Sequence, residues 1–230
     1  MTCPSRAALA SSLPALLTFV PFALAELSAP LTAQSPPFGA PSGQWRLVPV
    51  AQTPPPRTGF ALVATSSGEL LLVGGDLNTP NATEWLWDGV EWRPAPALLP
   101  RRIDPAVTAR PGTTGPIVYG GVGLNGPLGD AQILLGGTWV PLNFPGGALA
   151  EPSLAYDRNH DRTVLLGRDL TGAFQTWFYS PIAGWSRGPD VIAPRARLVG
   201  DAVRGDVTLF VQRAPVLEVQ RLDGQQWVSI

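Results

Sequence analysis

Two aspartates hold the same place in different parts of the sequence, and a pair of carboxylates can do acid and base chemistry. Asp76 follows the pair Gly74-Gly75 in GGDLN, and Asp169 follows the matching position in GRDLTG. On equivalent loops facing one cleft, the two could serve a glycoside hydrolase or a lyase as acid and base. Polar residues directly after a strand are also ordinary turn formers, so a turn is the alternative role.

The single histidine, His160, limits the metal and nucleophile chemistry available to the chain. It lies in DRNHD, which begins at Asp157 with the D-x-N-x-D spacing of a calcium loop. Arg162 stands where such a loop has a glycine, and Arg168 stands where a glutamate would close it. A polar hairpin turn therefore explains the segment better. No nucleotide-binding or nucleophile-elbow motif is present, so we expect no cofactor, no metal and no assigned catalytic residue.

The elements that would position these residues repeat along the chain. Two sequence features recur with the same period of 42 to 47 residues. A period of 20 to 50 residues is typical of solenoids, propellers and arrays. The first is a tryptophan shortly after a glycine, at Trp45, Trp92, Trp139, Trp185 and Trp227, with spacings of 47, 47, 46 and 42. The second is the end of an apolar run, at Gly75, Gly121, Arg168 and Gln212, with spacings of 46, 47 and 44.

Each repeat has the pattern of a small antiparallel sheet. The runs at 61–64 and 70–73 are rich in strand-forming residues and are separated by the turn sequence TSSGE. In WLWDGVEW and in RLDGQQW, the dipeptides Asp88-Gly89 and Asp223-Gly224 supply the backbone that a two-residue hairpin needs. Four strands per repeat are expected. A sheet of this size cannot bury both faces alone, so neighbouring repeats must stack.

The repeats resemble those of the kelch family, which carry a double glycine after the second strand and aromatic residues on the third and fourth. The second repeat lacks the third-strand aromatic, and the fourth lacks the glycine pair. The resemblance implies a β-propeller in which glycines allow close backbone approach and tryptophans pack between blades. The matches, over about residues 45–230, are Gly74-Gly75 with Trp87 and Trp92, Gly120-Gly121 with Trp139, and Gly167 with Tyr179 and Trp185.

The same resemblance suggests a ligand site. Arg57, Arg102 and Arg195 lie 17 or 18 residues before Gly74, Gly120 and Gln212, at the ends of the second strands of their repeats. In kelch propellers the first strand lines a central channel, so these guanidinium groups would surround one channel mouth, on the same side as Asp76 and Asp169. There they could capture a carboxylate or sulfate in a bidentate manner. The alternative is structural: each arginine pairs with a nearby carboxylate or donates to a loop carbonyl.

Four repeats leave the closure of the propeller open. A closed four-bladed ring, an open arc, and a half ring that pairs with a second copy as a homodimer all fit, and we favour the closed or nearly closed ring. Galactose oxidase, a copper enzyme of the kelch superfamily, needs two histidines and two tyrosines at its metal. With one histidine in the chain, that activity is excluded.

The N-terminal segment has its own character. Residues 1–25 combine Arg6, an apolar stretch and an A-x-A site, which predicts a signal peptide and a secreted or periplasmic protein with no membrane span after cleavage. Residues 26–43 are predicted to be a flexible Pro/Ala/Ser-rich linker, and residues 44–230 the propeller domain. The only cysteine, Cys3, lies within the leader.

Composition and net charge limit the classes of partner that the chain could bind. A net charge of −1 without a basic cluster argues against nucleic acid. The 25 glycines and 26 prolines fit many turns between short strands. The sequence thus predicts an all-β, kelch-like β-propeller of about four four-stranded blades. We expect it to bind a protein or carbohydrate partner through loops of one face. The alternative is a hydrolase or lyase that uses Asp76 and Asp169.

Overall fold

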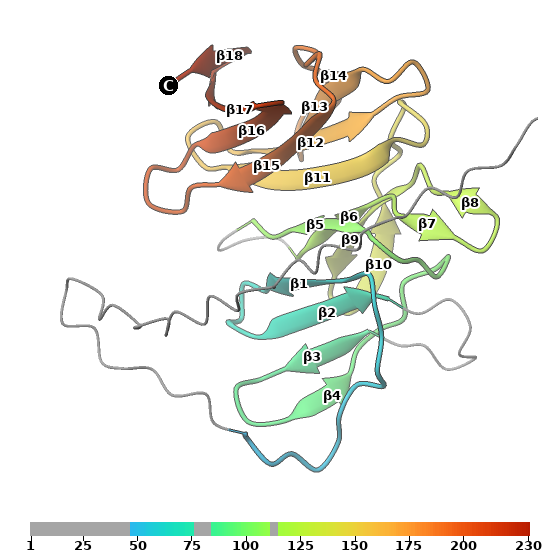
Figure 1. The fold of residues 1–230 in the computed structure, drawn as a ribbon. Coiled ribbons are helices and arrows are strands. Elements are labelled where there is room, and N and C mark those ends of the chain that lie inside the picture. Colours follow the sequence, from blue (N-terminus) through green and yellow to red (C-terminus); the bar gives the residue numbers. More distant parts are fainter. Residues whose placement is uncertain (1–46, 76–83, 111–114) are drawn as a thin grey trace, which may run out of the picture. The chain divides into compact units, whose positions relative to one another are not determined.

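The computed structural model describes residues 47–75, 84–110 and 115–230, which form β-strands joined by turns and loops. Sixteen of the strands form four antiparallel sheets of four strands each, which we number sheet 1 to sheet 4 in chain order (Figure 1). The described residues contain no helix, and thus none that is long and apolar enough to span a membrane. The prediction of an all-β chain with four-stranded antiparallel sheets is confirmed.

The strand bounds show how closely each repeat corresponds to one sheet. Sheet 1 is β1 (Phe60–Ala64), β2 (Leu70–Gly74), β3 (Trp85–Trp87) and β4 (Trp92–Pro94). Sheet 2 is β5 (Ala106–Thr108), β6 (Ile117–Tyr119), β9 (Ala131–Leu135) and β10 (Thr138–Pro141), with the hairpin β7 (Val122–Gly123) and β8 (Gly126–Pro127) inserted. Sheet 3 is β11 (Ala150–Asp157), β12 (Arg162–Arg168), β13 (Phe174–Ser180) and β14 (Gly184–Arg187). Sheet 4 is β15 (Arg195–Gly200), β16 (Val207–Arg213), β17 (Val216–Asp223) and β18 (Gln226–Ser229).

The Asp-Gly dipeptides form the hairpin turns that the sequence predicts. Gly89 has a φ of 102° between β3 and β4, in the left-handed region that only glycine adopts without strain. The Asp88 carboxylate accepts hydrogen bonds from the amides of Val90 and Glu91, both at 2.8 Å. Gly224 repeats the positive φ, at 57°, between β17 and β18. These turns fix the register of the third and fourth strands.

The glycine pairs lie where two stretches of backbone meet. A Cβ atom on Gly74 would lie 2.7 Å from the carbonyl oxygen of Arg102, and one on Gly121 would lie 2.5 Å from that of Ile103. Both glycines also have positive φ, at 71° and 91°. The amide of Gly75 donates to the Arg102 carbonyl at 2.9 Å, which joins sheet 1 to the segment leading into sheet 2. The expected close approach of backbone at the glycine pairs is confirmed at these positions.

Hydrophobic residues are buried between successive sheets. Alternate residues of each strand point to opposite faces, so a sheet can pack on both neighbours. Between sheets 1 and 2 the core includes Leu71, Val73, Leu86 and Val118. Between sheets 2 and 3 it includes Ile117, Tyr119, Ile133, Leu154 and Leu165. Between sheets 3 and 4 it includes Val164, Leu166, Phe178, Leu198, Leu209 and Val211.

The fourth-strand tryptophans of sheets 2, 3 and 4 link each of these sheets to the one before it. Their rings are partly buried in the inter-sheet cores, and each indole N–H donates back to the preceding repeat. A large aromatic body with a single donor suits a position that is apolar except for one acceptor. The bonds run from Trp139 to the Pro96 carbonyl at 2.9 Å, from Trp185 to the Leu142 carbonyl at 2.9 Å, and from Trp227 to the Thr176 hydroxyl at 3.2 Å.

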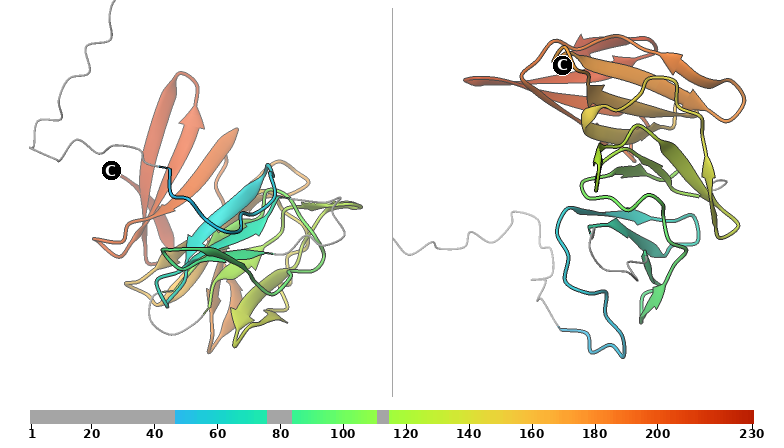
Figure 2. Two further views of the ribbon diagram at one scale, coloured as in Figure 1. Left: turned by 90° about the horizontal axis from the view of Figure 1, so that it is seen from below. Right: turned by 90° about the vertical axis from the view of Figure 1, so that its right-hand side faces the viewer.

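A closed propeller is not detected. The sheets succeed one another in chain order in Figure 1 and in the right-hand view of Figure 2. Among the described residues, no strand pairing and no buried cluster joins sheet 4 back to sheet 1. The described compact unit is Val48–Ile230. The predicted signal peptide (1–25) and linker (26–43) lie outside the described residues.

Candidate ligand-binding site

Arg102, one of the three predicted channel-mouth arginines, lies in the segment that leads into sheet 2 and is buried. Its side chain is 1% exposed. The two terminal nitrogens form a bidentate pair with the Asp130 carboxylate, at 2.9 and 2.8 Å, and Nη1 also donates to the Gly120 carbonyl at 2.9 Å. Nε donates to the Pro100 carbonyl at 3.1 Å. The pairing with a carboxylate and a loop carbonyl is the structural role that the sequence left open.

Arg57 makes the corresponding bond in sheet 1. Its Nη1 donates to the Gly74 carbonyl at 3.1 Å, and its Nε donates to the Pro55 carbonyl at 3.3 Å. Gly74 and Gly120 are both the first glycine of a pair, so the 17- or 18-residue spacing of Arg57 and Arg102 has a local cause. Each arginine reaches the carbonyl at the end of the second strand of its own sheet.

Arg195 differs from the other two. It begins β15, lies opposite Gln212 in register, and is exposed. Within the described chain its guanidinium makes no hydrogen bond or ion pair, and it lines a groove with Arg197 and Phe210 on sheet 4. Arg57 and Arg102 instead donate to the carbonyls of Gly74 and Gly120 in their own repeats.

Of the two predicted aspartates, Asp76 lies outside the described residues, and Asp169 forms a turn. Asp169 Oδ1 accepts from the amide and hydroxyl of Thr171, at 2.8 and 2.6 Å, and from the Ala173 amide at 3.2 Å. Its Oδ2 accepts from the Gln175 amide group at 2.7 Å. The Thr171 and Gln175 side-chain bonds lower the pKa of Asp169 to about 2. Asp169 is thus held as a carboxylate, the form suited to accepting hydrogen bonds.

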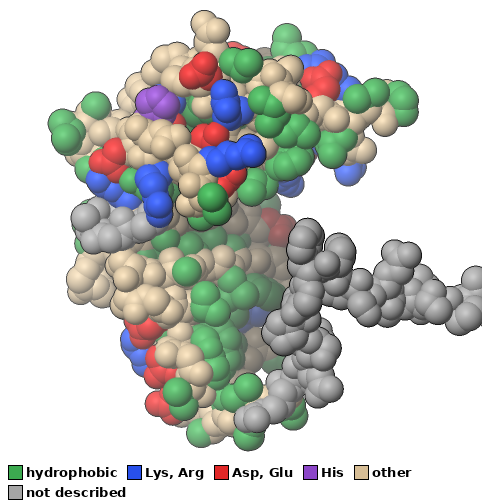
Figure 3. All heavy atoms as spheres, turned by 90° about the vertical axis from the view of Figure 1, so that its left-hand side faces the viewer, with side chains coloured by type: hydrophobic (Ala, Val, Ile, Leu, Met, Phe, Trp, Pro, Cys, Tyr) green, Lys and Arg blue, Asp and Glu red, His purple; other side chains and the backbone are tan. Residues whose placement is uncertain are grey.

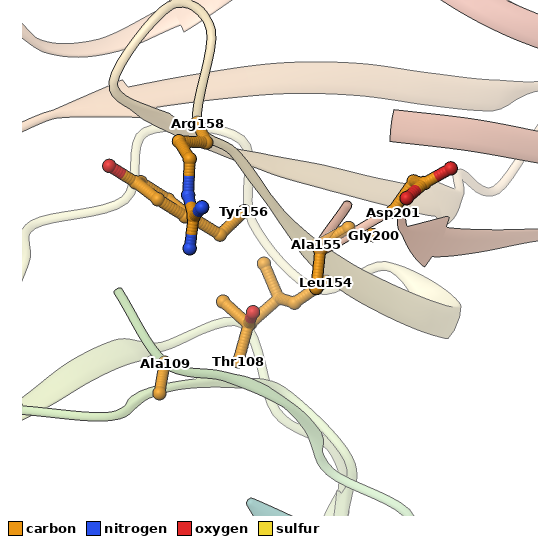
Figure 4. A pocket seen from close by; sticks show the side chains of 9 residues that line it. Thr108, Ala109, Leu154, Ala155, Tyr156, Arg158, Gly200 and Asp201 are labelled. Carbon is orange, nitrogen blue, oxygen red and sulfur yellow. The ribbon is translucent and has the colours of Figure 1, made fainter. Parts of the chain in front are cut away.

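A different cavity lies where the first strands of sheets 2, 3 and 4 end. It has a volume of about 240 Å³ and is open to solvent. Figure 4 shows that Thr108 and Ala109 face Tyr156 and Arg158 across the space, with Asp201 on the far side from Arg158. We call it the strand-end cavity. Its lining residues are Thr108, Ala109, Leu154, Ala155, Tyr156, Arg158, Gly200, Asp201 and Ala202.

Arg158 brings unused hydrogen-bond donors to the strand-end cavity. It lies in the β11–β12 turn, is exposed, and makes no side-chain hydrogen bond or ion pair with any described residue. The neighbouring Tyr156 hydroxyl donates to Asp161, whose carboxylate also pairs with Arg110. Burial, and then the bond to Asp161, raise the pKa of Tyr156, so the phenol stays neutral. This network fixes the Tyr156 ring beside the Arg158 guanidinium.

Asp201 supplies acceptors on the far side of the strand-end cavity. Its Oδ1 accepts from the amides of Val203 and Arg204, both at 2.9 Å, and these bonds lower its pKa. The turn that follows β15 is thereby fixed, and the carboxylate stays charged. With the Thr108 hydroxyl, the cavity offers guanidinium donors, carboxylate acceptors, a hydroxyl and an aromatic ring. Such a set of convergent polar groups beside apolar surface is typical of a small-molecule site.

The DRNHD turn is a structural hairpin. Asp157 is buried and accepts from Arg162 Nε at 3.0 Å and from its turn neighbour His160 at 2.9 Å. The Arg162 guanidinium also stacks 3.9 Å from the centre of the Phe178 ring. In the described ranges no group of three His, Cys, Asp or Glu side chains is placed to hold a metal.

Sequence reasoning missed the residues of the strand-end cavity because, although each lies at or just after the end of a first strand, their residue types do not recur from repeat to repeat. Arg158 comes from a hairpin turn, Thr108 from a strand end and Asp201 from the turn after β15. The signal that could have found them is topological. When successive sheets stack in the same orientation, the ends of their first strands lie close together.

The fold and the cavity define an all-β repeat protein of stacked four-stranded sheets with a small polar site at the strand ends. No protein-family model matches the chain, so the kelch resemblance stays a prediction. No curated protein matches it at a significant level.

Solved structures do match, in 79 chains. One is described as the SapL1 lectin in complex with alpha methyl fucoside, with a TM-score of 0.56 and 17% sequence identity. The matched region covers 75% of this chain and 62% of the lectin chain, so this chain spans less than two thirds of that lectin's length. At this identity the likeness shows a shared β fold.

Proposed function

We propose that this protein is a carbohydrate-binding module, and that a sugar binds in the strand-end cavity. The observation that carries the proposal is the exposed Arg158 guanidinium, which has no partner among the described side chains and lies beside Tyr156, opposite Thr108. Neighbouring hydroxyl groups of a sugar present donors and acceptors together. A guanidinium, a carboxylate and a hydroxyl around one small cavity match that pattern.

The size of the cavity and the structural neighbour support this proposal. About 240 Å³ is below the usual range for drug-sized ligands and suits a single sugar ring. The Tyr156 ring offers an apolar surface to the C–H groups of such a ring. A solved structure with the same kind of fold is that of a lectin in complex with a fucoside.

The proposal also includes the finer features that the sequence predicts. The sheets would be kelch-like blades of a propeller, and the protein would be exported through the predicted leader. A sugar-binding module of this kind would act outside the cytoplasm, where its carbohydrate partners lie. The loops at the strand ends of sheets 2 to 4 would form the binding face.

Calorimetric titration tests the carbohydrate site. The probes are alpha methyl fucoside and a set of other neutral and acidic methyl glycosides. We expect one or more to bind the parent, and Arg158→Ala to weaken binding about tenfold or more, because a hydrogen bond to a charged group contributes about 1.5 to 3 kcal/mol. Thr108→Val should also weaken it. Arg213→Ala, an exposed arginine of β16 paired with Glu218, is the matched control.

Two outcomes would contradict the strand-end cavity as the site. One is unchanged affinity in a folded Arg158→Ala variant. The other is loss of binding in Arg195→Ala alone, which would favour the arginine site predicted from the repeats. Binding of proteins but of no glycoside would support the alternative of a protein partner.

A further inference from the structure

The first and last sheets each have one face that no other described sheet covers. On sheet 1 this face, which we call the leading face, carries Phe60, Leu62, Leu70, Trp85, Trp87 and Trp92. On sheet 4 the uncovered face, which we call the trailing face, carries Arg197, Val199, Phe210, Leu217, Val219 and Val228. Hydrophobic side chains are exposed at several places on the molecular surface drawn in Figure 3. Because the sheets repeat, each of these two faces has an equivalent face in sheet 3 that is covered by a neighbouring sheet.

The leading face of sheet 1 repeats a face that is buried in sheet 3. Leu62 pairs with Leu72 and Leu72 with Trp85, as Leu154 pairs with Leu165 and Leu165 with Trp177. Trp92 lies opposite Trp87 as Trp185 lies opposite Tyr179. In sheet 3 this set packs on sheet 2. Leu154 is therefore 9% exposed, whereas its equivalent Leu62 is 51% exposed; Leu72, between Leu62 and Trp85, is buried, so the exposure is greatest on β1.

The trailing face of sheet 4 likewise repeats the face by which sheet 3 packs on sheet 4. Phe210 lies between Arg197 and Val219 in register, as Leu166 lies between Ser153 and Thr176. Leu166 is fully buried in the core between sheets 3 and 4. Leu217, next to Phe210 on the trailing face, is 59% exposed. This face is also hollowed by a groove of about 410 Å³, lined by Arg195, Arg197, Phe210 and Leu217 among others.

We propose that the leading face of one copy packs on the trailing face of a second copy. By the repeat, each sheet's leading face fits the trailing face of the sheet before it, as three internal interfaces show. The groove on the trailing face would receive the aromatic side chains of the leading face. Within the described chain, sheets 1 and 4 are separated by these three interfaces and share no buried cluster.

This pairing closes with two copies. The two faces differ, so the contact is head to tail, and a two-fold arrangement satisfies both faces of each copy at once. Two chains of four sheets give a ring of eight, within the range of four to eight blades that propellers use. The strand-end cavity lies at the loop ends of the sheets rather than on either face, so the pairing leaves it open.

Sedimentation and light scattering on the purified protein test the pairing. We expect a species of twice the chain mass at micromolar concentration, and a single-chain mass for both Leu62→Glu and Leu217→Glu. An equimolar mixture of these two variants keeps one intact interface, formed by the trailing face of the first and the leading face of the second. Mixing should therefore restore a mixed dimer. Leu170→Glu, which changes an exposed loop leucine off both faces, is the control and should remain dimeric.

Several results would overturn the proposal. A single-chain mass for the parent at all concentrations would do so, as would a dimer that Leu62→Glu breaks and Leu217→Glu does not, because that would mean like faces pair. If either variant fails to fold by circular dichroism, Phe60→Glu and Val199→Glu replace it on the same faces. A folded monomer whose two faces resist covalent labelling would show that they are covered within one chain.

Discussion

At the scale of single residues, Arg102 and Asp130 show how a buried charge is accommodated in a sheet of short strands. All three guanidinium nitrogens of Arg102 donate hydrogen bonds, to the Asp130 carboxylate and to two backbone carbonyls. Burial acts to raise the pKa of Asp130, but the bonds from Arg102 and Gln132 outweigh it and lower the pKa below its usual value. The folded chain therefore favours the ionised form of the Asp130 side chain over the protonated form.

The pH dependence of stability follows from this lowered pKa. A carboxyl whose folded pKa lies below the unfolded value, about 3.9, stabilises the fold above that pH, and the contribution is lost as pH falls through the folded pKa. Asp130→Asn should lower the free energy of unfolding at neutral pH by about 3 kcal/mol, since it leaves Arg102 buried without its carboxylate. It should also flatten the decline in stability below pH 4.

Urea unfolding between pH 2 and 7 checks this expectation. The control is Asp190→Asn, which removes the exposed partner of Arg187 and should change stability by less than about 1 kcal/mol. Equal loss of stability in the two variants at pH 7 would show that the Arg102 pair contributes no more than a surface ion pair.

The arginine spacing also shows what sequence can predict at this scale. The recurrence at 17 or 18 residues is real, and two of the three arginines use it to reach the carbonyl of a glycine pair. A spacing relative to a strand end fixes which backbone group an arginine can reach. It does not show whether the side chain turns inward or toward a ligand, because that depends on acceptors such as Asp130, 28 residues further along.

At the scale of elements, the hairpins and their tryptophans were predictable because they depend on local backbone chemistry. Asp-Gly turns, apolar runs and the regular tryptophans predicted the strands, and the strands lie there. The short β3, β4, β5 and β6 have only three residues each, too few for alternation to set their bounds. Their positions depend on pairing with neighbours in the sheet.

Trp139 and Trp92 should differ in their effect on stability. Trp139 is partly buried between sheets 1 and 2 and donates to the Pro96 carbonyl, so Trp139→Ala should cost about 3 to 5 kcal/mol. Trp92 occupies the same repeat position on the uncovered leading face, against Trp87 at a ring separation of 5.5 Å. At concentrations where the protein is monomeric, Trp92→Ala should therefore lower the free energy of unfolding clearly less than Trp139→Ala does.

Thermal and urea unfolding of both variants measure this difference. Trp185→Ala, in the same setting as Trp139 between sheets 2 and 3, should behave like Trp139→Ala. If Trp139→Ala leaves the melting temperature unchanged, the tryptophans do not hold the sheets together.

At the scale of the whole molecule, the sequence could predict stacking but not the site. The repeat period predicts small sheets that cover one another's faces, and three hydrophobic cores lie between successive sheets as this predicts. The strand-end cavity depends on how three sheets are placed side by side, which no motif encodes. Ring closure is equally undetermined by the repeat, because the same complementary faces can pair within one chain or between two.

Hydrogen exchange should show a gradient of protection along the four sheets. Local opening is easiest where few apolar contacts and short strands hold the backbone. Sheet 3 is covered on both faces and has a buried second strand, β12, so its amides should exchange slowest. The three-residue β3 and β4 of sheet 1 should exchange fastest, because one of their faces is uncovered.

Measured at two protein concentrations, the same exchange experiment reports on association. Pairing of leading and trailing faces would slow exchange in β3, β4, β17 and β18 as concentration rises, and would leave β12 unchanged, because linkage stabilises only the elements that the partner covers. Leu62→Glu should abolish the concentration dependence without altering β12. Uniform protection of all four sheets at every concentration would mean that the end sheets are as well covered as the middle ones, and that the chain itself covers its leading and trailing faces in solution.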